Sequence, residues 1–390
     1  MSHLTSEQAD ALALGLVSGL GPRTVSALLD HFGSYSTIRQ ASAAQLNQVP
    51  RIGVKLSHQF AKALADADVE TEIQRITQHG VRFVLRGEVG YPAPLAMLED
   101  APHLLYYRGG WSPADTNAVA IVGSRDCSTY GRRMTQQLAT ELVQAGYTVV
   151  SGLARGIDGE AHQAALRAGG RTLAVLAGGL SNIYPPEHRV LADEVAAQGA
   201  ILSETPMTMT PQKGLFHARN RLISGLAQAV VVVEAGAKSG TLITVRYAAE
   251  QNRDVFAFPA NADSPSSQGN LELLRNQGAR MIRNASDLLE DLQGIMPRSE
   301  TIPSASPSAT RVPKTPPVPT ATSATPPVKP VPSGLTPEQQ QLWDLLREPM
   351  HQDELVRQLG RTVSEVNMDI MKLEMKRVIK RLPGNRFERE

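Results

Sequence analysis

Short apolar runs that alternate with helical segments constrain the fold of this chain more than any other feature. Between residues 117 and 282, runs rich in Val, Ile and Ala are separated by segments of helical periodicity. Strands that are apolar throughout are buried on both faces, which is typical of a parallel sheet covered by helices on both sides. The predicted strands are Ala118–Val122, Thr148–Val150, Thr172–Leu176, Ala200–Leu202, Val230–Val233 and Val255–Phe258, followed by a short Arg280–Ile282.

The segments between these strands complete the pattern. The predicted helices are Gly131–Ala145, Asp158–Ala168, Pro186–Ala197 and Leu242–Gln251. Two more short strands, Val81–Leu85 and His103–Tyr107, precede the alternating region. The pattern predicts an α/β fold with a Rossmann-like, doubly wound and mainly parallel sheet. Ligands of such sheets bind at the carboxyl ends of the strands.

Both flanks of this region differ from it in composition. Residues 1–75 have helical periodicity interrupted by glycine turns at 19–22 and 50–55, which resembles a pair of helix–hairpin–helix (SAM-like) units. A small helical bundle with glycine C-caps explains the same pattern. Residues 335–390 fit a winged-helix unit, with helices at Pro337–Arg347, Gln352–Leu359 and Val363–Arg377 before a wing.

A proline-rich segment separates the C-terminal unit from the rest. Pro297–Pro332 holds 11 of the 26 prolines, with Ser, Thr, Ala and Val between them. Such a segment buries too little apolar surface to order itself, so we expect an extended tether rather than a proline-rich ligand. The predicted domains are therefore 1–75 (helical), 80–295 (Rossmann-like), 296–334 (disordered linker) and 335–390 (winged helix).

Composition excludes several classes of protein. The single cysteine, Cys127, rules out a disulfide framework and a cysteine-rich zinc site, and we expect it to be a small buried side chain rather than a reactive thiol. The N-terminal residues lack a charged region followed by an apolar core, and no apolar run reaches the roughly 18 residues of a membrane span. We therefore expect a soluble, cytoplasmic protein. The net charge of +1 still allows a local basic groove.

Two strand-end turns have the composition of anion sites. After the first parallel strand come Gly123, Ser124 and Arg125, where glycine allows close approach of a ligand and the guanidinium suits phosphate. A later loop, Lys238–Thr241, contains Lys238, Ser239, Gly240 and Thr241 and could form an anion nest before a helix. Neither GxGxxG nor GxxxxGK[ST] occurs, so the dinucleotide and P-loop fingerprints are absent.

The densest group of cations and rings lies at 211–226, PQKGLFHARNRLISGL. Lys213 can bind a phosphate, and Phe216 either stacks on a base or anchors the loop in the core. Arg219 and Arg221 diverge on a helix, so one contacts the ligand and the other pairs or packs. Asn220 can bind a base edge or a backbone group. The candidate DNA-binding residues are Gly123, Ser124, Arg125, Lys213, Phe216, Arg219, Asn220, Arg221, Lys238, Ser239, Gly240 and Thr241.

The remaining polar residues do not make a catalytic set. We expect Asp158 to cap the helix after SGLARGID (151–158), and His162, one turn later, to pair with it. Tyr184 either stacks on a ligand or fills its loop, and Glu204 and Glu234 are isolated strand-end acids. Because no nucleophile–base pair or metal cluster is recognisable, the sequence predicts a binding protein with no catalytic residues, cofactor or metal.

An ordered set of motifs carries a family resemblance. The motifs are GSR (123–125), SGLARGID (151–158), LAGGLSNIYPPEH (176–188), KGLFHARNRLISGLA (213–227), SGTLIT (239–244) and RDVFAFPA (253–260). Together they resemble the DprA (Smf) family of DNA-processing proteins, and the likeness covers residues 81–282.

The resemblance implies a function in natural transformation. It implies a homodimer, formed through the Rossmann-like domain, that protects incoming single-stranded DNA and loads the RecA recombinase onto it. It also places Arg125, Lys213 and Phe216 in the DNA pocket, and Asn220 and Arg221 match the family's RNR run.

Two other functions lack the motifs that they require. Lysine-decarboxylase-like nucleotide phosphoribohydrolases carry a Gly-Gly-x-Gly-Thr-x-x-Glu loop, and here Thr244 stands where that glutamate belongs. A dinucleotide-dependent oxidoreductase lacks its fingerprint. In the C-terminal unit, contact with DNA and contact with protein both stay open, because acidic residues interrupt the basic ones. The basic residues are Lys372, Lys376, Arg377, Lys380, Arg381 and Arg386.

Overall fold

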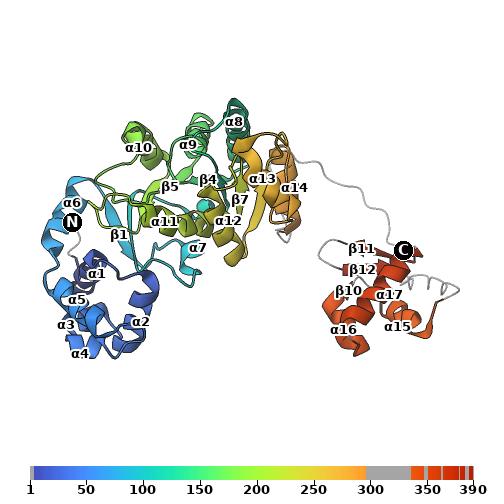
Figure 1. Cartoon of the computed structure of the whole chain (residues 1–390), viewed down its shortest axis with the longest axis horizontal. Coiled ribbons are helices and arrows are strands. Elements are labelled where there is room, and N and C mark those ends of the chain that lie inside the picture. The colour runs from blue at the N-terminus through green and yellow to red at the C-terminus, as the bar shows by residue number, and fades with distance from the viewer. Residues whose placement is uncertain are drawn as a thin grey trace, which may run out of the picture. The chain divides into compact units, whose positions relative to one another are not determined.

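The computed structural model describes residues 4–295, 335–346, 350–361, 363–376, 378–382 and 386–389. The chain forms two compact units, Met1–Asp291 and Leu292–Glu390 (Figure 1). The predicted linker at 296–334 lies outside the described residues. Within the described part, no helix has the length and apolar character needed to cross a membrane.

A nine-stranded sheet forms the centre of the first unit, counted over its described residues. The strand order is β1-β2-β6-β5-β4-β3-β7-β8-β9, in which β1–β2 and β2–β6 pair antiparallel and all other neighbours pair parallel. The predicted α/β sheet is thus confirmed. The strands are β1 (Arg82–Leu85), β2 (Leu104–Gly109), β3 (Ala118–Val122), β4 (Thr148–Ser151), β5 (Thr172–Val175), β6 (Ala200–Ser203), β7 (Ala229–Val232), β8 (Asp254–Ala257) and β9 (Arg280–Met281).

Helices cover both faces of this sheet, as the uniformly apolar strands require. Figure 1 shows α8, α9 and α10 above the sheet and α7, α11 and α12 below it. The predicted helix at 186–197 begins later, because Pro186–His188 forms a 3-10 turn first. The helices are α7 (Ala93–Ala96), α8 (Thr129–Gln144), α9 (Ile157–Arg167), α10 (Arg189–Gln198), α11 (Lys213–Leu226), α12 (Thr241–Glu250), α13 (Gln268–Arg275) and α14 (Ala285–Ile295).

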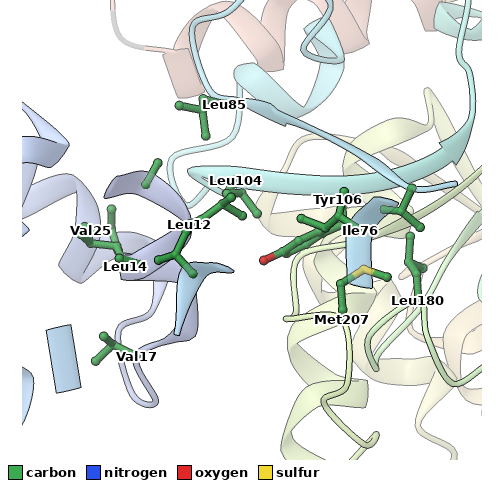
Figure 2. Close-up of a cluster of buried hydrophobic side chains, with 14 of the residues drawn as sticks. Leu12, Leu14, Val17, Val25, Ile76, Leu85, Leu104, Tyr106, Leu180 and Met207 are labelled. Atoms are coloured by element: carbon green, nitrogen blue, oxygen red, sulfur yellow. The ribbon is translucent and has the colours of Figure 1, made fainter. Parts of the chain in front are cut away.

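Six further helices, within the described N-terminal residues, share a hydrophobic core with the sheet. One hydrophobic cluster joins them: Leu12 and Ile76 lie in the same core as Tyr106, Leu180 and Met207 (Figure 2). The helical part and the sheet are therefore parts of one compact unit. The helices are α1 (Ser6–Leu16), α2 (Pro22–Phe32), α3 (Tyr35–Gln40), α4 (Ala43–Leu46), α5 (Val54–Ala65) and α6 (Val69–Gln78).

The second unit is a small winged-helix fold. Its elements are α15 (Pro337–Leu345), β10 (Met350–His351), α16 (Gln352–Leu359), α17 (Val363–Met375), β11 (Ile379–Leu382) and β12 (Arg386–Arg389). The start of α15 is fixed by a capping box, in which Thr336 and Gln339 satisfy each other's backbone amides. Leu342, Leu355 and Phe387 are buried in its core. The predicted helix ends at Arg347 and Arg377 lie outside the described residues.

Candidate nucleic-acid interface

The strand order creates a crevice beside β3. The strand β3 pairs with β4 on one side and with β7 on the other, so the chain winds outward from β3 in both directions. Loops that follow β3 and β7 diverge at such a switch point and leave room for a ligand. A cavity of about 630 Å³, called the groove below, lies here. Its lining includes Gly123, Ser124, Arg125, Asp158, Lys213, Phe216, His217, Arg219, Asn220, Ser239, Gly240, Thr241 and Thr244.

The turn after β3 forms one wall of the groove. A Cβ on Gly123 would lie 2.5 Å from Cγ1 of Ile157 and 2.9 Å from the Glu234 carbonyl oxygen, so only glycine fits there. The Ser124 amide donates to that same carbonyl at 2.7 Å, which ties the β3 turn to the end of β7. Arg125 is exposed, and its guanidinium lies 4.7 Å from the centre of the Phe216 ring.

The start of α11 forms the opposite wall. Lys213 is the first residue of this helix and is exposed, whereas Phe216 is half-buried. The Phe216 ring also lies edge-on to Tyr184, with 6.1 Å between the ring centres. Neither α11 nor α12 has a side-chain cap or an acidic residue in its first turn. Both helix N-termini therefore present a positive dipole end to the groove. At the start of α12, the amides of Ser239 and Thr241 already donate to the Gly236 carbonyl and to Oγ of Ser239.

Arg219 lies beneath the groove rather than on its surface. Its side chain is buried, with 5% exposed, and Nη1 donates to the carbonyl oxygens of Gly152 and Val175. Burial lowers the pKa of Arg219 to about 10, so the guanidinium remains charged at neutral pH. Asn220 accepts from Nε of Arg219 at 3.2 Å and donates to the Gly240 carbonyl at 3.4 Å. These two residues hold together the ends of β4 and β5 and the start of α12.

Arg221 and Lys238 do not line the groove. Arg221 is buried and pairs with Glu204, and it also donates to the Asp100 carbonyl at 2.7 Å. Burial raises the pKa of Glu204, and the Arg221 charge opposes that shift. Lys238 is exposed in the loop after β7, one residue before Ser239. Arg219 and Arg221 thus point to different surroundings, as expected for residues two apart on a helix.

Two local predictions are wrong. Gly156, not Asp158, takes the N-cap position of α9, because a Cβ at Gly156 would lie 2.3 Å from the Ser124 carbonyl and only glycine allows that approach. Asp158 lies in the first turn and accepts from the Ala154 amide at 3.4 Å; burial raises its pKa, and Arg219 opposes this. His162 bonds the Thr172 hydroxyl at 2.7 Å instead of pairing with Asp158.

The other polar side chains that could have taken part in catalysis make structural contacts instead. Cys127 is buried, as predicted, and burial raises the pKa of its thiol, which is the opposite of an activated nucleophile. Glu234 is buried and accepts from both the amide and the hydroxyl of Ser128. Within the described ranges, no group of three or more His, Cys, Asp or Glu is arranged to hold a metal ion.

A second cavity of about 20 Å³, far smaller than the groove, adjoins it and was not predicted from the sequence. It shares Arg125, Ala154 and Phe216 with the groove and extends past Asn182 and Tyr184. Tyr184 remains 44% exposed at its mouth. The available signal was the motif at 176–188, whose glycines lie directly after β5. The groove also includes His217, which no sequence pattern singled out.

Comparison with known families agrees with this architecture. Residues 82–293 match the model of the DNA recombination-mediator protein A family. Residues 323–385 match the DprA winged-helix domain, and residues 11–66 match a SAM-like tandem of helix–hairpin–helix motifs. The expected helix–hairpin–helix and winged-helix parts are thus confirmed.

Individual relatives agree along most of the chain. Protein Smf of Synechocystis is 34% identical over 98% of this chain and 99% of its own length. The solved structure of DNA processing protein A from Streptococcus pneumoniae superposes with a TM-score of 0.64 at 31% identity, covering 73% of this chain and 97% of that one. A structure from Helicobacter pylori, whose title describes its single-stranded DNA binding mode, gives a TM-score of 0.50 at 33% identity, covering 55% and 95%. This chain belongs to the DNA recombination-mediator protein A family, whose members are named DprA or Smf.

Proposed function

We propose that this protein binds single-stranded DNA in the groove and acts as a recombination mediator. One observation supports this most: Arg125, Lys213 and Phe216 converge with the positive dipole ends of two helices at one crevice. Cations and amides suit phosphates, and a partly exposed ring suits an unpaired base. The Helicobacter pylori relative, named for its single-stranded DNA binding, supports the same ligand class.

Each group in the groove has a distinct part in this proposal. Arg125 and Lys213 contact phosphates, while the positive dipole end of α12 at Ser239–Thr241 favours another anion. Phe216 stacks on one base, which duplex DNA cannot present because its bases are already stacked. Lys238 adds positive charge at the rim. Arg219 and Asn220 shape the floor, and Arg221 is left out because it is buried with Glu204.

We further propose that the protein is not an enzyme. Thr244 lines the groove where a nucleotide phosphoribohydrolase would need its glutamate. Asp158 and Glu234 are held by backbone and hydroxyl donors. Protection of incoming transforming DNA, loading of RecA and dimerisation through the sheet-containing unit are proposed from the family membership.

The test compares single-stranded and duplex oligonucleotides by fluorescence anisotropy over a salt series. We expect a preference for the single strand and a steep salt dependence, because phosphate contacts release counterions. Lys213→Ala should weaken binding, whereas Arg167→Ala, an exposed cation in the last turn of α9 at the opposite edge of the sheet, should not. Equal affinity for both DNA forms, or equal effects of both variants, would argue against the groove as the DNA site.

A further inference from the structure

We propose that Glu72, in the N-terminal helical part, is a positioning residue for the groove. It holds the segment that leads into α11 and thereby sets the positions of Lys213 and Phe216. The inference rests on the proposed single-stranded DNA binding. Through Glu72, the helical part contributes to the affinity for DNA without contacting the DNA.

The central observation is one buried hydrogen bond. Glu72 lies in α6 with 1% of its surface exposed, and its Oε1 accepts from the Met207 amide at 2.8 Å, across 135 residues of sequence. Its Oε2 has no hydrogen-bond partner among the described residues and lies 3.7 Å from Nη1 of Arg75. A carboxylate this deeply buried is costly unless it is bonded, so the Met207 amide is a principal partner.

The surroundings of Glu72 are apolar, which makes this bond hard to replace. Tyr106 is fully buried beside it, and burial together with the Glu72 charge raises the pKa of the Tyr106 hydroxyl well above its usual value. Figure 2 shows Tyr106 and Met207 in the cluster that joins the helical part to the sheet.

Met207 belongs to the connection between β6 and α11. Its side chain is fully buried, and its carbonyl accepts from the Ser181 amide at 3.0 Å. Two residues later, the Met209 carbonyl accepts from the Gly179 amide at 2.8 Å. Amides of the loop after β5 therefore bind the carbonyls of Met207 and Met209 in this connection. The Glu72 carboxylate binds the Met207 amide. The chain then enters α11 at Lys213 and reaches Phe216 within the first helical turn.

Loss of the Glu72 bond should act on DNA affinity through the position of α11. A buried amide without an acceptor destabilises the native path of residues 204–212, so conformers in which the amide is hydrated gain population. The apparent affinity of a ligand falls in proportion to the fraction of molecules in the binding-competent state. Glu72 thus influences binding without touching the ligand.

The experiment uses the full chain and three substitutions. Glu72→Ala removes the acceptor and should weaken single-stranded DNA binding about tenfold, the scale of one unmade buried hydrogen bond. Glu72→Gln keeps an acceptor oxygen and should bind DNA within about twofold of wild type. The small loss is expected because a neutral acceptor makes a weaker hydrogen bond than a charged one. Glu70→Ala is the matched control, because Glu70 is exposed on the same helix and bonds only Gln74 among the described residues.

Two readouts separate positioning from general destabilisation. Hydrogen exchange of residues 205–216 should accelerate in Glu72→Ala, while exchange in β7 and β8 stays at its wild-type rate. In a mutant cycle, Glu72→Ala should cost little extra affinity in a background that carries both Lys213→Ala and Phe216→Ala, because the contacts that Glu72 positions are already absent. If Glu72→Ala does not fold, Glu72→Met is used in its place, because methionine keeps the length of the side chain but has no acceptor oxygen.

The outcomes are distinguishable. A folded Glu72→Ala or Glu72→Met protein with wild-type affinity, or one whose effect adds fully to that of the Lys213→Ala, Phe216→Ala pair, would overturn the positioning role and leave DNA binding intact. Equal losses in Glu72→Ala and Glu72→Gln would overturn it as well. Absence of single-stranded DNA binding by the wild-type chain would instead refute the proposed function itself.

Discussion

Replacing Phe216 by alanine is the most direct test of base stacking in the groove. Base–aromatic stacking contributes about 1–3 kcal/mol per base when measured by alanine substitution. The Phe216 ring is half-buried, with Arg125 at 4.7 Å and Tyr184 at 6.1 Å, so part of its surface is already occupied. We therefore expect a loss of about 1–2 kcal/mol, the lower part of that range, which corresponds to a roughly 5- to 30-fold weaker affinity.

The assay is anisotropy of a labelled oligonucleotide at several salt concentrations, with melting temperature measured on the same sample. The slope of log K against log salt should stay unchanged, because no charge is removed. Phe216→Leu separates stacking from packing, since leucine keeps apolar volume in the half-buried position but has no aromatic face. Tyr147→Ala is the control: this partly exposed ring precedes β4, at the opposite edge of the sheet.

Stacking on a base and packing in the core predict different results for Phe216→Leu. Phe216→Leu should melt close to wild type and still lose most of the affinity that Phe216→Ala loses. A leucine variant that binds as tightly as wild type would refute stacking and leave Phe216 as a packing residue of α11.

Four further predictions address charge, stability and domain organisation. Lys213→Ala should flatten the slope of log K against log salt by roughly 0.7, the value for one phosphate contact on a single strand, and an unchanged slope in a folded variant would exclude that contact. Arg221→Met should lower the free energy of unfolding by about 3–5 kcal/mol in denaturant titration, because its buried carboxylate partner is left unpaired, while the folded fraction keeps the wild-type salt slope. Burial lowers the pKa of His162 from 6.5 to about 3, so as pH falls below 6.5 the unfolded chain takes up a proton that the folded one does not. Stability should thus fall by about 2 kcal/mol between pH 7 and pH 5 from this residue, and His162→Asn should remove that part of the pH dependence. Deleting 297–390 should leave a dimer that binds single strands within a few-fold of wild type, as measured by light scattering and anisotropy, and a monomer without DNA affinity would contradict this.

The fold was predictable because its strands carry a strong local signal. Runs such as Ala118–Val122 and Val230–Val233 suit only a sheet covered on both faces, and the carboxyl ends of parallel strands lie at one edge. That geometry is why Arg125 and the start of α11, far apart in the sequence, could be expected to meet. Short-range patterns and one rule of topology were sufficient for this part of the site.

Other features depend on contacts that no local pattern contains. The sequence indicated that Arg219 and Arg221 diverge, but not which one is buried beside Glu204. Gly156 occupies the N-cap position of α9, where its backbone lies against the carbonyl of Ser124, a residue more than thirty positions earlier. The bond from Glu72 to Met207 joins residues 135 positions apart, and an isolated glutamate in a helix gives no sign of it.

The buried guanidinium of Arg219 has a consequence for the rates of binding. Because it ties the carbonyls of Gly152 and Val175 together, the walls of the groove are already in place before DNA arrives. A preformed site needs no slow rearrangement, so association should be limited by diffusion and by electrostatic steering from exposed cations such as Arg125 and Lys213. Raising the salt concentration should therefore slow association. Replacing Phe216 should leave the association rate almost unchanged and shorten the lifetime of the complex.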